Sequence, residues 1–228
     1  MTWIDQLKDT FLEDNRYMWM VEGLGNTLLI TLGALAIGVI IGTLVAVAKY
    51  FCEGNKKLRF VIWLCDLYTT VIRGIPMTVL LLVFFFVIFV SARDGVPVAI
   101  AAFGINSGAY MAELIRSGIN AVDKGQMEAA RSLGMSKGQA MAKIIMPQAV
   151  KYILPAIGNE CIALLKETSV AGYVAVVDVT KAATNIRNKT YDAVNPILLL
   201  ALVYLVMVVI LTRLLDILER RLRKSDGK

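Results

Sequence analysis

Charged side chains stand inside long apolar stretches of this sequence, where they can bind a charged solute or pair with one another. An ionisable group at the centre of a bilayer costs about 3 kcal/mol or more unless it is paired or hydrated, so each one is a candidate functional residue. The positions concerned are Asp66, Arg73, Glu113, Arg116, Glu160 and the adjacent pair Lys166 and Glu167. Glu113 and Arg116 lie three residues apart on one helix face, which predicts a gating or structural pair.

Two segments carry groups that can meet a solute with charges of both signs. Arg73 stands directly before a Gly-Ile-Pro sequence, where proline disfavours helix and leaves backbone carbonyls free to bind. Glu160 and Glu167 share one side of a later helix, and Lys166 lies about 100° around it from Glu167. The predicted pathway residues are Asp66, Tyr68, Arg73, Glu160, Lys166, Glu167, Thr168 and Ser169. A buried network between helices, with no solute, is the alternative for these residues.

Composition excludes several kinds of chemistry. The sequence has no histidine, which excludes a histidine-based triad, a histidine metal site and a histidine proton relay. It has no phosphate-binding loop, and Asp66 and Asp178 lack the Gly-x-Gly-Asp setting of an intramembrane aspartyl enzyme. We therefore expect no catalytic residues, no metal and no cofactor. The net charge of +6 does not indicate nucleic-acid binding, because the basic residues cluster beside the apolar segments.

The same composition predicts an all-α membrane protein. Hydrophobic residues make up 57% of the 228 positions and the mean hydropathy is +0.66, which is too apolar for a soluble domain of this size. Five transmembrane helices are predicted, at about residues 25–48, 58–92, 98–120, within 153–177, and at 194–212. The second is expected to be one tilted span, kinked at the Gly-Ile-Pro sequence.

Shorter segments connect and flank these spans. Residues 1–19 are mixed polar and aromatic, which predicts an N-terminal interfacial segment before a transmembrane domain at 20–222. A short helix that starts at Gln139 is expected to stop at Pro147, and residues 181–192 are expected to form a polar loop. In the first span, Gly33, Gly38 and Gly42 either allow another helix to approach closely or are simply tolerated. The three cysteines are interpreted as free thiols.

Charge distribution predicts the topology. Basic residues gather in the loop at 49–59, in the stretch at 123–151 and in the tail at 223–228, whereas the N-terminal segment is mainly acidic. The positive-inside rule then places the N-terminus outside the cell, and the C-terminus and the 123–147 stretch in the cytoplasm.

The 123–147 stretch is polar and has the pattern of a short, capped helix. Asp123 can cap its start with Gln126 reaching back, and Gly134 can end it in a left-handed turn. Ser136 and Gln139 form a capping box for the next helix. On a helical wheel, one face carries Met127, Ala130 and Leu133 or Gly134, and the other carries Lys124, Glu128 and Arg131. Pattern alone favours a solvated helix on the membrane surface.

The spacing within this stretch resembles the Glu-Ala-Ala signature of ABC-importer permeases. Glu128-Ala129-Ala130 is followed by Gly134 and then by Ile144-x-Met146-Pro147, in which Met146 for leucine is the only departure. Further segments are similar to the polar-amino-acid branch of that family, which serves histidine, glutamine, arginine and cystine; they lie at 106–116, 125–126, 131–134, 147–149 and 165–169. The matches run from about residue 20 to residue 180.

This resemblance implies the type I ABC importer permease fold, with the Glu-Ala-Ala helix as a coupling helix that docks on an ATP-hydrolysing subunit. The coupling residues that it implies are Gly125, Glu128, Ala129, Ala130 and Gly134. It also implies two ABC ATPase subunits, a second permease copy or a paralogue, an extracytoplasmic amino-acid-binding protein, and a prokaryotic plasma membrane with its lipids. The solute is then expected to be a polar or charged L-amino acid, with Arg73 facing its carboxylate and Glu160 or Asp66 its cationic group.

An ion-coupled secondary transporter or channel is the alternative function. The broken second span and the intramembrane carboxylates favour it, because both features occur at binding sites of such proteins. Against it, the five predicted spans show no internal repeat, and the capped cytoplasmic helix is left without a role.

Overall fold

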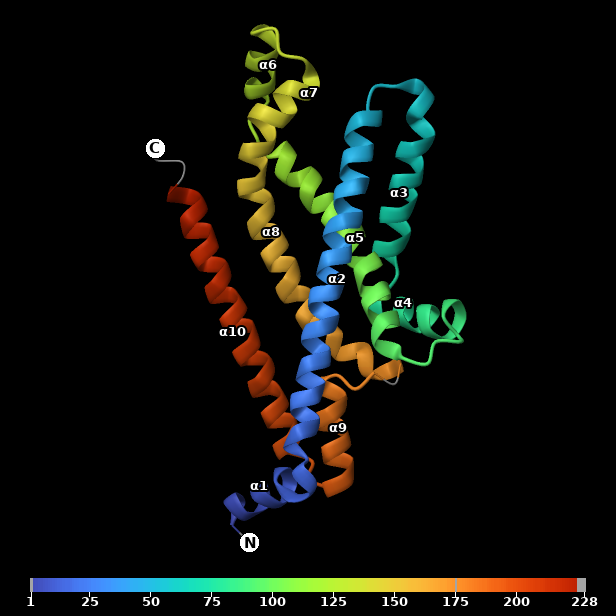
Figure 1. Cartoon of the computed structure of the whole chain (residues 1–228), viewed down its shortest axis with the longest axis vertical. Helices are drawn as coiled ribbons and strands as arrows, with labels where there is room; N and C mark the ends of the chain where they lie inside the picture. The colour runs from blue at the N-terminus through green and yellow to red at the C-terminus, as the bar shows by residue number, and fades with distance from the viewer. Residues whose placement is uncertain (1, 175, 225–228) are drawn as a thin grey trace.

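The computed structural model describes residues 2–174 and 176–224, and every regular element in this part of the chain is helical. The helices form one elongated bundle (Figure 1). One end of the bundle carries α1 (Trp3–Phe11) and the opposite end carries α6 (Lys124–Ser132). The predicted all-α fold is therefore confirmed.

The centre of the bundle is the pair formed by α2 (Tyr17–Cys52) and α5 (Gly95–Asn120). The two helices approach closely because glycines remove side chains from the contact. A Cβ atom on Gly38 would lie 2.6 Å from Ser107 Oγ, and one on Gly33 would lie 3.0 Å from a side-chain methyl group of α5. Close approach is thus the correct interpretation of these glycines. α2 also extends beyond both ends of the span predicted for it.

The second apolar segment folds as α3 (Arg59–Gly74) and α4 (Met77–Val83), followed by a π-helical turn, η3 (Phe84–Ile88). The helices on the two sides of the break are bent by 106°, which is far more than the expected kink. Pro76 causes the break, because it lacks an N–H group and disfavours helix at Ile75, whose backbone is extended.

α8 (Met146–Glu167) follows α7 (Lys137–Ala140) through a π-helical turn, η4 (Met141–Ile145). The prediction that Pro147 stops a short helix is wrong. Pro147 lies in the first turn of α8, where a helix does not need the backbone N–H group that proline lacks. After Glu167 the chain tightens into the 3₁₀ helix η5 (Thr168–Val174), so the fourth predicted span does not continue as α-helix.

The prediction of a polar loop at 181–192 is also wrong, because α9 (Val179–Thr190) occupies most of this segment. Asp178 caps this helix by accepting hydrogen bonds from the N–H groups of Thr180 and Lys181. The buried face of α9 consists of Val179, Ala182, Ala183 and Ile186. This face packs against α2 and the start of α10 (Asn195–Lys224).

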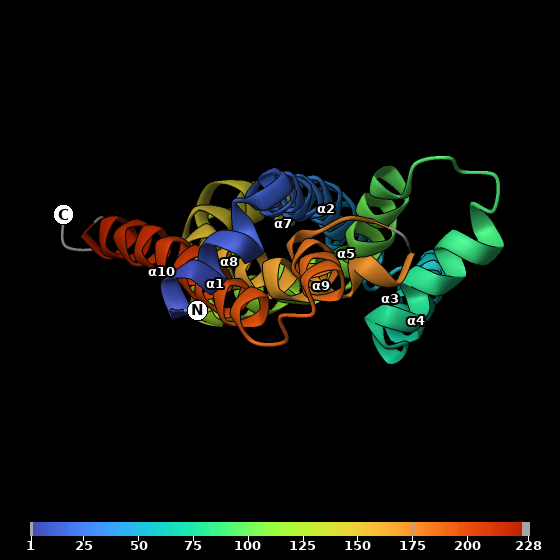
Figure 2. The ribbon, with the colours of Figure 1, turned by 90° about the horizontal axis from the view of Figure 1, so that it is seen from below.

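α1 lies across the foot of the bundle, next to the connection between α9 and α10 (Figures 1 and 2). The Thr10 hydroxyl donates a hydrogen bond to Asp192 Oδ2 at 2.8 Å, and Trp3 Nε1 donates to Asn195 Oδ1 at 3.1 Å. Asn195 in turn donates to Asp192 Oδ2 at 2.7 Å. Burial alone would raise the pKa of Asp192, but the hydrogen bonds from Asn195, Thr10 and Val194 lower it below its ordinary value.

Replacing Asp192 with alanine should lower the free energy of unfolding by about 1–3 kcal/mol, because buried donors lose their acceptor. Since the pKa of Asp192 is lower in the folded chain than in the unfolded chain, its contribution is complete above the unfolded pKa and is lost as the pH falls through the folded pKa. The melting temperature should therefore fall more steeply in acid for the wild type than for Asp192→Asn. The exposed control Asp9→Asn should follow the wild type. If the melting temperatures of the wild type and of Asp192→Asn fell equally as the pH is lowered, this role would be contradicted.

Among the described residues, three helices are long and apolar enough to cross a membrane, at Glu13–Cys52, Gly95–Asn120 and Asn195–Leu222. The bent pair adds a fourth if it crosses as one unit. The remaining predicted span, on α8, is more polar, so the number of five spans stays a prediction. Residues 225–228 of the predicted tail lie outside the described residues.

Candidate functional site

α6 begins and ends at the predicted residues. Asp123 caps the helix by accepting a hydrogen bond from the Gly125 N–H group at 2.6 Å, and Gly134 ends it with a φ of +82°. The Gln126 side chain was expected to reach back to the cap. Instead, its oxygen accepts a hydrogen bond from Gln148 of α8 at 3.5 Å, so it links α6 to the bundle.

One face of α6 packs on the bundle and the other is exposed. Ala130 is 4% exposed, and Met127 packs against a buried cluster that includes Ile145. Leu133 shares a side of the helical wheel with Met127 and Ala130, but it is 84% exposed and does not pack on the bundle. The predicted coupling residues on the exposed face are Gly125, Glu128, Ala129 and Gly134. The predicted coupling residues on this face are thus accessible to another protein.

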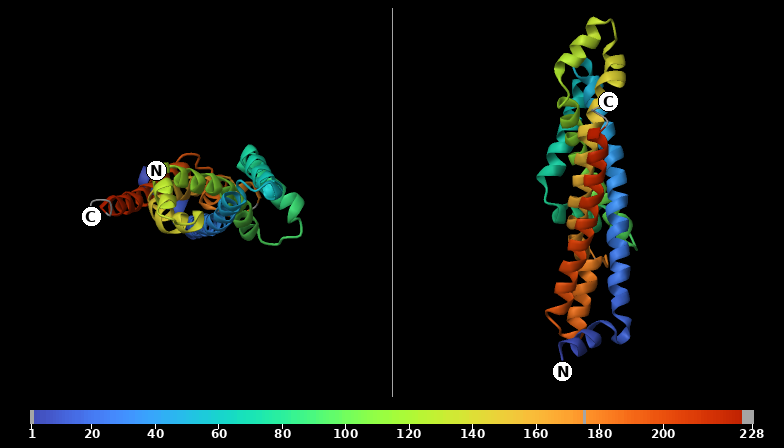
Figure 3. Two further views of the ribbon diagram at one scale, coloured as in Figure 1. Left: turned by 90° about the horizontal axis from the view of Figure 1, so that it is seen from above. Right: turned by 90° about the vertical axis from the view of Figure 1, so that its left-hand side faces the viewer.

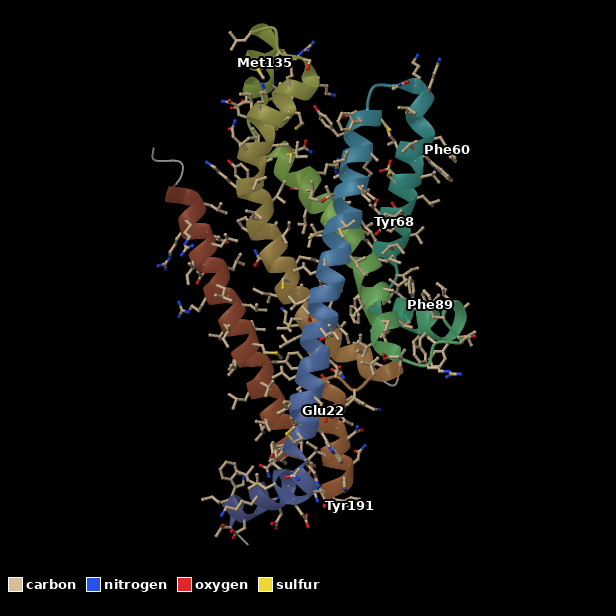
Figure 4. All side chains as sticks on the ribbon, viewed as in Figure 1. Glu22, Phe60, Tyr68, Phe89, Met135 and Tyr191 are labelled. Carbon is tan, nitrogen blue, oxygen red and sulfur yellow. The ribbon has the colours of Figure 1, made fainter. Side chains whose placement is uncertain are left out.

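α6 and α7 form a tip at one end of the bundle, where Met135 marks the connection between them (Figure 4). Ser136 and Gln139 form the predicted capping box of α7: each side chain accepts a hydrogen bond from the other's backbone N–H group, at 3.2 and 2.9 Å. The Lys137 ammonium lies 4.8 Å from the centre of the Tyr50 ring. The tip is therefore in direct contact with the end of α2.

On α5, the structure brings Glu113 and Arg116 together, with 3.0 Å between Glu113 Oε2 and Arg116 Nη2. A third residue joins them. Lys49 was assigned to a loop but lies within α2, and its Nζ is 3.4 Å from Glu113 Oε1 and 2.8 Å from Asp66 Oδ1. The sequence signal was weak, since a lysine at the end of an apolar run is most simply explained by membrane topology.

Arg73 of α3 and Glu160 of α8 line one cavity of about 390 Å³, together with Tyr110 and Glu113 of α5. The Arg73 guanidinium lies 5.2 Å from the centre of the Tyr110 ring, within reach of a cation–π interaction. Glu160 Oε1 accepts a hydrogen bond from Ser107 Oγ at 3.2 Å. The cavity thus offers a guanidinium and carboxylates from three helices to a charged solute. Tyr110 and Ser107 had no predicted role.

The other predicted pathway residues lie elsewhere. Tyr68 points from α3 into the bundle, where its hydroxyl donates to the Ile105 carbonyl at 2.7 Å (Figure 4). Thr168 is buried, and its hydroxyl donates to the Leu165 carbonyl at 2.7 Å. These two residues do not line the Arg73–Glu160 cavity, and neither do the remaining four: Asp66, Lys166, Glu167 and Ser169. Helical spacing alone could not reveal this, because it fixes a face but not the neighbour of that face.

The described residues contain no group of three or more histidine, cysteine, aspartate or glutamate side chains placed to hold a metal ion. The three cysteines are Cys52, Cys65 and Cys161, and all are free thiols, as interpreted from the sequence.

Comparison with known sequences connects this arrangement to curated relatives. The arginine transport system permease protein ArtQ of Bacillus subtilis is 37% identical over 211 residues, which cover 91% of this chain and 94% of the relative. A probable glutamine ABC transporter permease protein, GlnM of Bacillus subtilis, is 38% identical over 218 residues, which cover 95% and 98%.

Solved structures agree in fold. A crystal structure of an amino acid ABC transporter with histidines is 40% identical, with a TM-score of 0.83 over 92% of this chain and 98% of that chain. An inward-facing MetNI methionine ABC transporter is 20% identical with a TM-score of 0.73, which shows the type I importer fold alone. A family model, described as the inner membrane component of binding-protein-dependent transport systems, matches residues 34–224. The chain belongs to this family of binding-protein-dependent transport system inner membrane components.

Proposed function

We propose that the chain is a membrane-spanning permease subunit of an ATP-driven importer and forms the passage for a polar or charged L-amino acid. The observation that carries this proposal is the cavity that Arg73 and Glu160 share. A free amino acid carries a carboxylate and an ammonium group, and both need partners in a low-dielectric passage. The names of the relatives, which refer to arginine and glutamine transport, support the same class of solute.

Arg73 is the group suited to the carboxylate, because its planar guanidinium can donate two parallel hydrogen bonds. Its position over Tyr110 supports this role, since the ring orients the guanidinium without neutralising it. Glu160 is the group suited to the cationic end of the solute. Asp66 is not retained at this site, because it lines a different cavity and is paired with Lys49.

Coupling to ATP hydrolysis is assigned to the exposed face of α6. The sequence has no phosphate-binding loop, so ATP hydrolysis is assigned to separate subunits. The proposed assembly contains two ABC ATPase subunits and a second permease chain, either identical or paralogous. An extracytoplasmic amino-acid-binding protein delivers the solute at the opposite end of the bundle, where α1 and α9 lie.

The topology that we infer has the N-terminus outside the inner membrane of a bacterium and the C-terminus in the cytoplasm. α10 ends on the side of the bundle that carries α6, whereas the N-terminus lies at the other end (Figure 1). In a variant without its native cysteines, Asp5→Cys should react with an impermeant maleimide added outside the cell. Glu219→Cys should react only after the membrane is permeabilised. Labelling of both positions from the same side would contradict five spans.

Co-purification with a tagged ABC ATPase from the same genome tests the assembly. We expect the ATPase to bind the wild-type chain and its ATP hydrolysis to rise when binding protein and amino acid are added. An ion-coupled secondary transporter or channel predicts no ATPase binding, and uptake by the chain alone along an ion gradient. That result would overturn the proposed function.

A further inference from the structure

Four charged side chains form a chain of alternating sign across three helices. Asp66 of α3 pairs with Lys49 of α2 at 2.8 Å, Lys49 pairs with Glu113 of α5 at 3.4 Å, and Glu113 pairs with Arg116 at 3.0 Å. The two oxygens of Glu113 serve different partners, with Oε1 facing Lys49 and Oε2 facing Arg116. The two cations and two anions balance, so these four side chains are electrically neutral as a unit.

Burial singles out the middle of this chain. The Lys49 side chain is 15% exposed and that of Glu113 is 25% exposed, whereas Asp66 and Arg116 are 58% and 60% exposed. Exposed ion pairs contribute little, but removing one partner of a buried pair leaves the other charge without compensation. The Lys49–Glu113 contact is therefore the part of the chain with the largest energetic weight.

The charged chain borders two cavities. One is the Arg73–Glu160 cavity described above. The other, of about 320 Å³, is lined by Lys49, Asp66 and residues near the end of α2 such as Glu53. Glu113 and Arg116 line both cavities, so they form part of the wall that the two share.

α3 is held at the side of the bundle (Figure 3). Its outer side carries large exposed side chains such as Phe60 (Figure 4). Its polar contacts with the neighbouring helices include the Tyr68 hydrogen bond to α5 and the Asp66–Lys49 bridge to α2. Breaking the bridge would remove the ion pair that links α3 to α2 beside the second cavity.

The residue after Lys49 connects this region to the tip of the molecule. Tyr50 lines the second cavity, and its ring accepts the Lys137 ammonium of α7 at 4.8 Å. The α6–α7 tip is therefore in direct side-chain contact with the helix turn that carries Lys49.

We propose that Lys49 is a positioning residue that closes the passage between the two cavities by holding α3 against α2 and α5 through Asp66 and Glu113. The gate opens when movement of the α6–α7 tip breaks the ion pairs of Lys49 with Asp66 and Glu113. An amino acid lowers the cost of opening, because its own ammonium can replace Lys49 beside Glu113. This inference rests on the proposed function and adds to it the residue that controls release.

Passive efflux tests the gate directly. The complete complex is reconstituted in vesicles that are preloaded with a labelled amino acid and contain no ATP. Lys49→Met keeps the length of the side chain but removes its charge, and should raise efflux about tenfold, which corresponds to ~1.4 kcal/mol of lost closing free energy. Lys49→Arg retains the charge and should stay close to the wild type. The control Lys56→Met removes an exposed lysine for which no ion pair occurs within the described residues, and should change nothing.

A merely structural bridge gives a different result. Lys49→Met would then lower the melting temperature but leave efflux at the wild-type level, and this outcome would overturn the proposal. If Lys49→Met does not assemble, Asp66→Asn replaces it, since an exposed carboxylate is less costly to neutralise. ATP-driven import by the wild-type complex is measured in parallel. Its absence would refute the proposed function, whereas normal import with unchanged efflux in both variants refutes only the gate.

Discussion

Replacing Glu128 with lysine should lower ATP-driven uptake about tenfold or more while the protein stays folded in the membrane. Glu128 lies on the exposed face of α6, so the substitution reverses a charge at the surface proposed to dock on the ATPase. Exposed substitutions away from packed features change stability by only about 0.5 kcal/mol. Uptake and ATP hydrolysis measured on the same reconstituted sample would show hydrolysis that no longer drives transport.

Gly134 provides a second variant of the same face, with a matched control in Gly138. Both glycines have open space where a Cβ would lie, but only Gly134 has a positive φ, of +82°. Gly134→Asp should cost ~1 kcal/mol in local strain and disturb the end of α6, whereas Gly138→Asp adds the same charge without that strain. Normal transport by Glu128→Lys and Gly134→Asp would show that α6 is not the coupling helix.

Replacing Glu160 with glutamine should raise the amino acid concentration needed for half-maximal uptake about tenfold. The amide oxygen can still accept the Ser107 hydrogen bond, so the fold is retained while the charge facing the solute is lost. Arg73→Lys should have a similar effect, because lysine cannot hold a carboxylate with a planar pair of donors. Uptake of a panel of acidic, neutral and basic amino acids, with melting curves for each variant, measures both effects.

Glu167→Gln is the matched control for the cavity. It makes the same chemical change on the same helix, but Glu167 does not line the Arg73–Glu160 cavity. Uptake by the Glu167→Gln variant should equal that of the wild type for every amino acid tested. If Glu160→Gln lowers the melting temperature and leaves the order of preferred amino acids unchanged, the carboxylate belongs to a structural network and not to a binding site.

Local rules predicted the features of this protein that depend on a few neighbouring residues. Pro76 breaks the second apolar segment because of its own covalent geometry, and the cap at Asp123 and the turn at Gly134 need only the adjacent backbone. The same rules gave the wrong prediction for Pro147. A proline in the interior of a helix ends it, whereas a proline in the first turn of a helix is tolerated, and Pro147 lies in the first turn of α8.

Features that depend on packing were not visible in the sequence. α9 is polar overall, and its buried face is short, so only its contact with α2 and α10 distinguishes it from a loop. Lys49 looked like a topological charge until α3 and α5 placed Asp66 and Glu113 beside it. The meeting of Arg73 and Glu160 likewise requires α3 and α8, which are far apart in the chain, to reach the same cavity.

The most direct test of the central claim is uptake of labelled amino acids by vesicles that contain the chain with its ATPase, its partner permease and the binding protein. We predict uptake of polar or charged L-amino acids that requires ATP and the binding protein, and that falls when Glu160 is replaced by glutamine. Uptake that proceeds without the ATPase and follows an ion gradient would contradict the account.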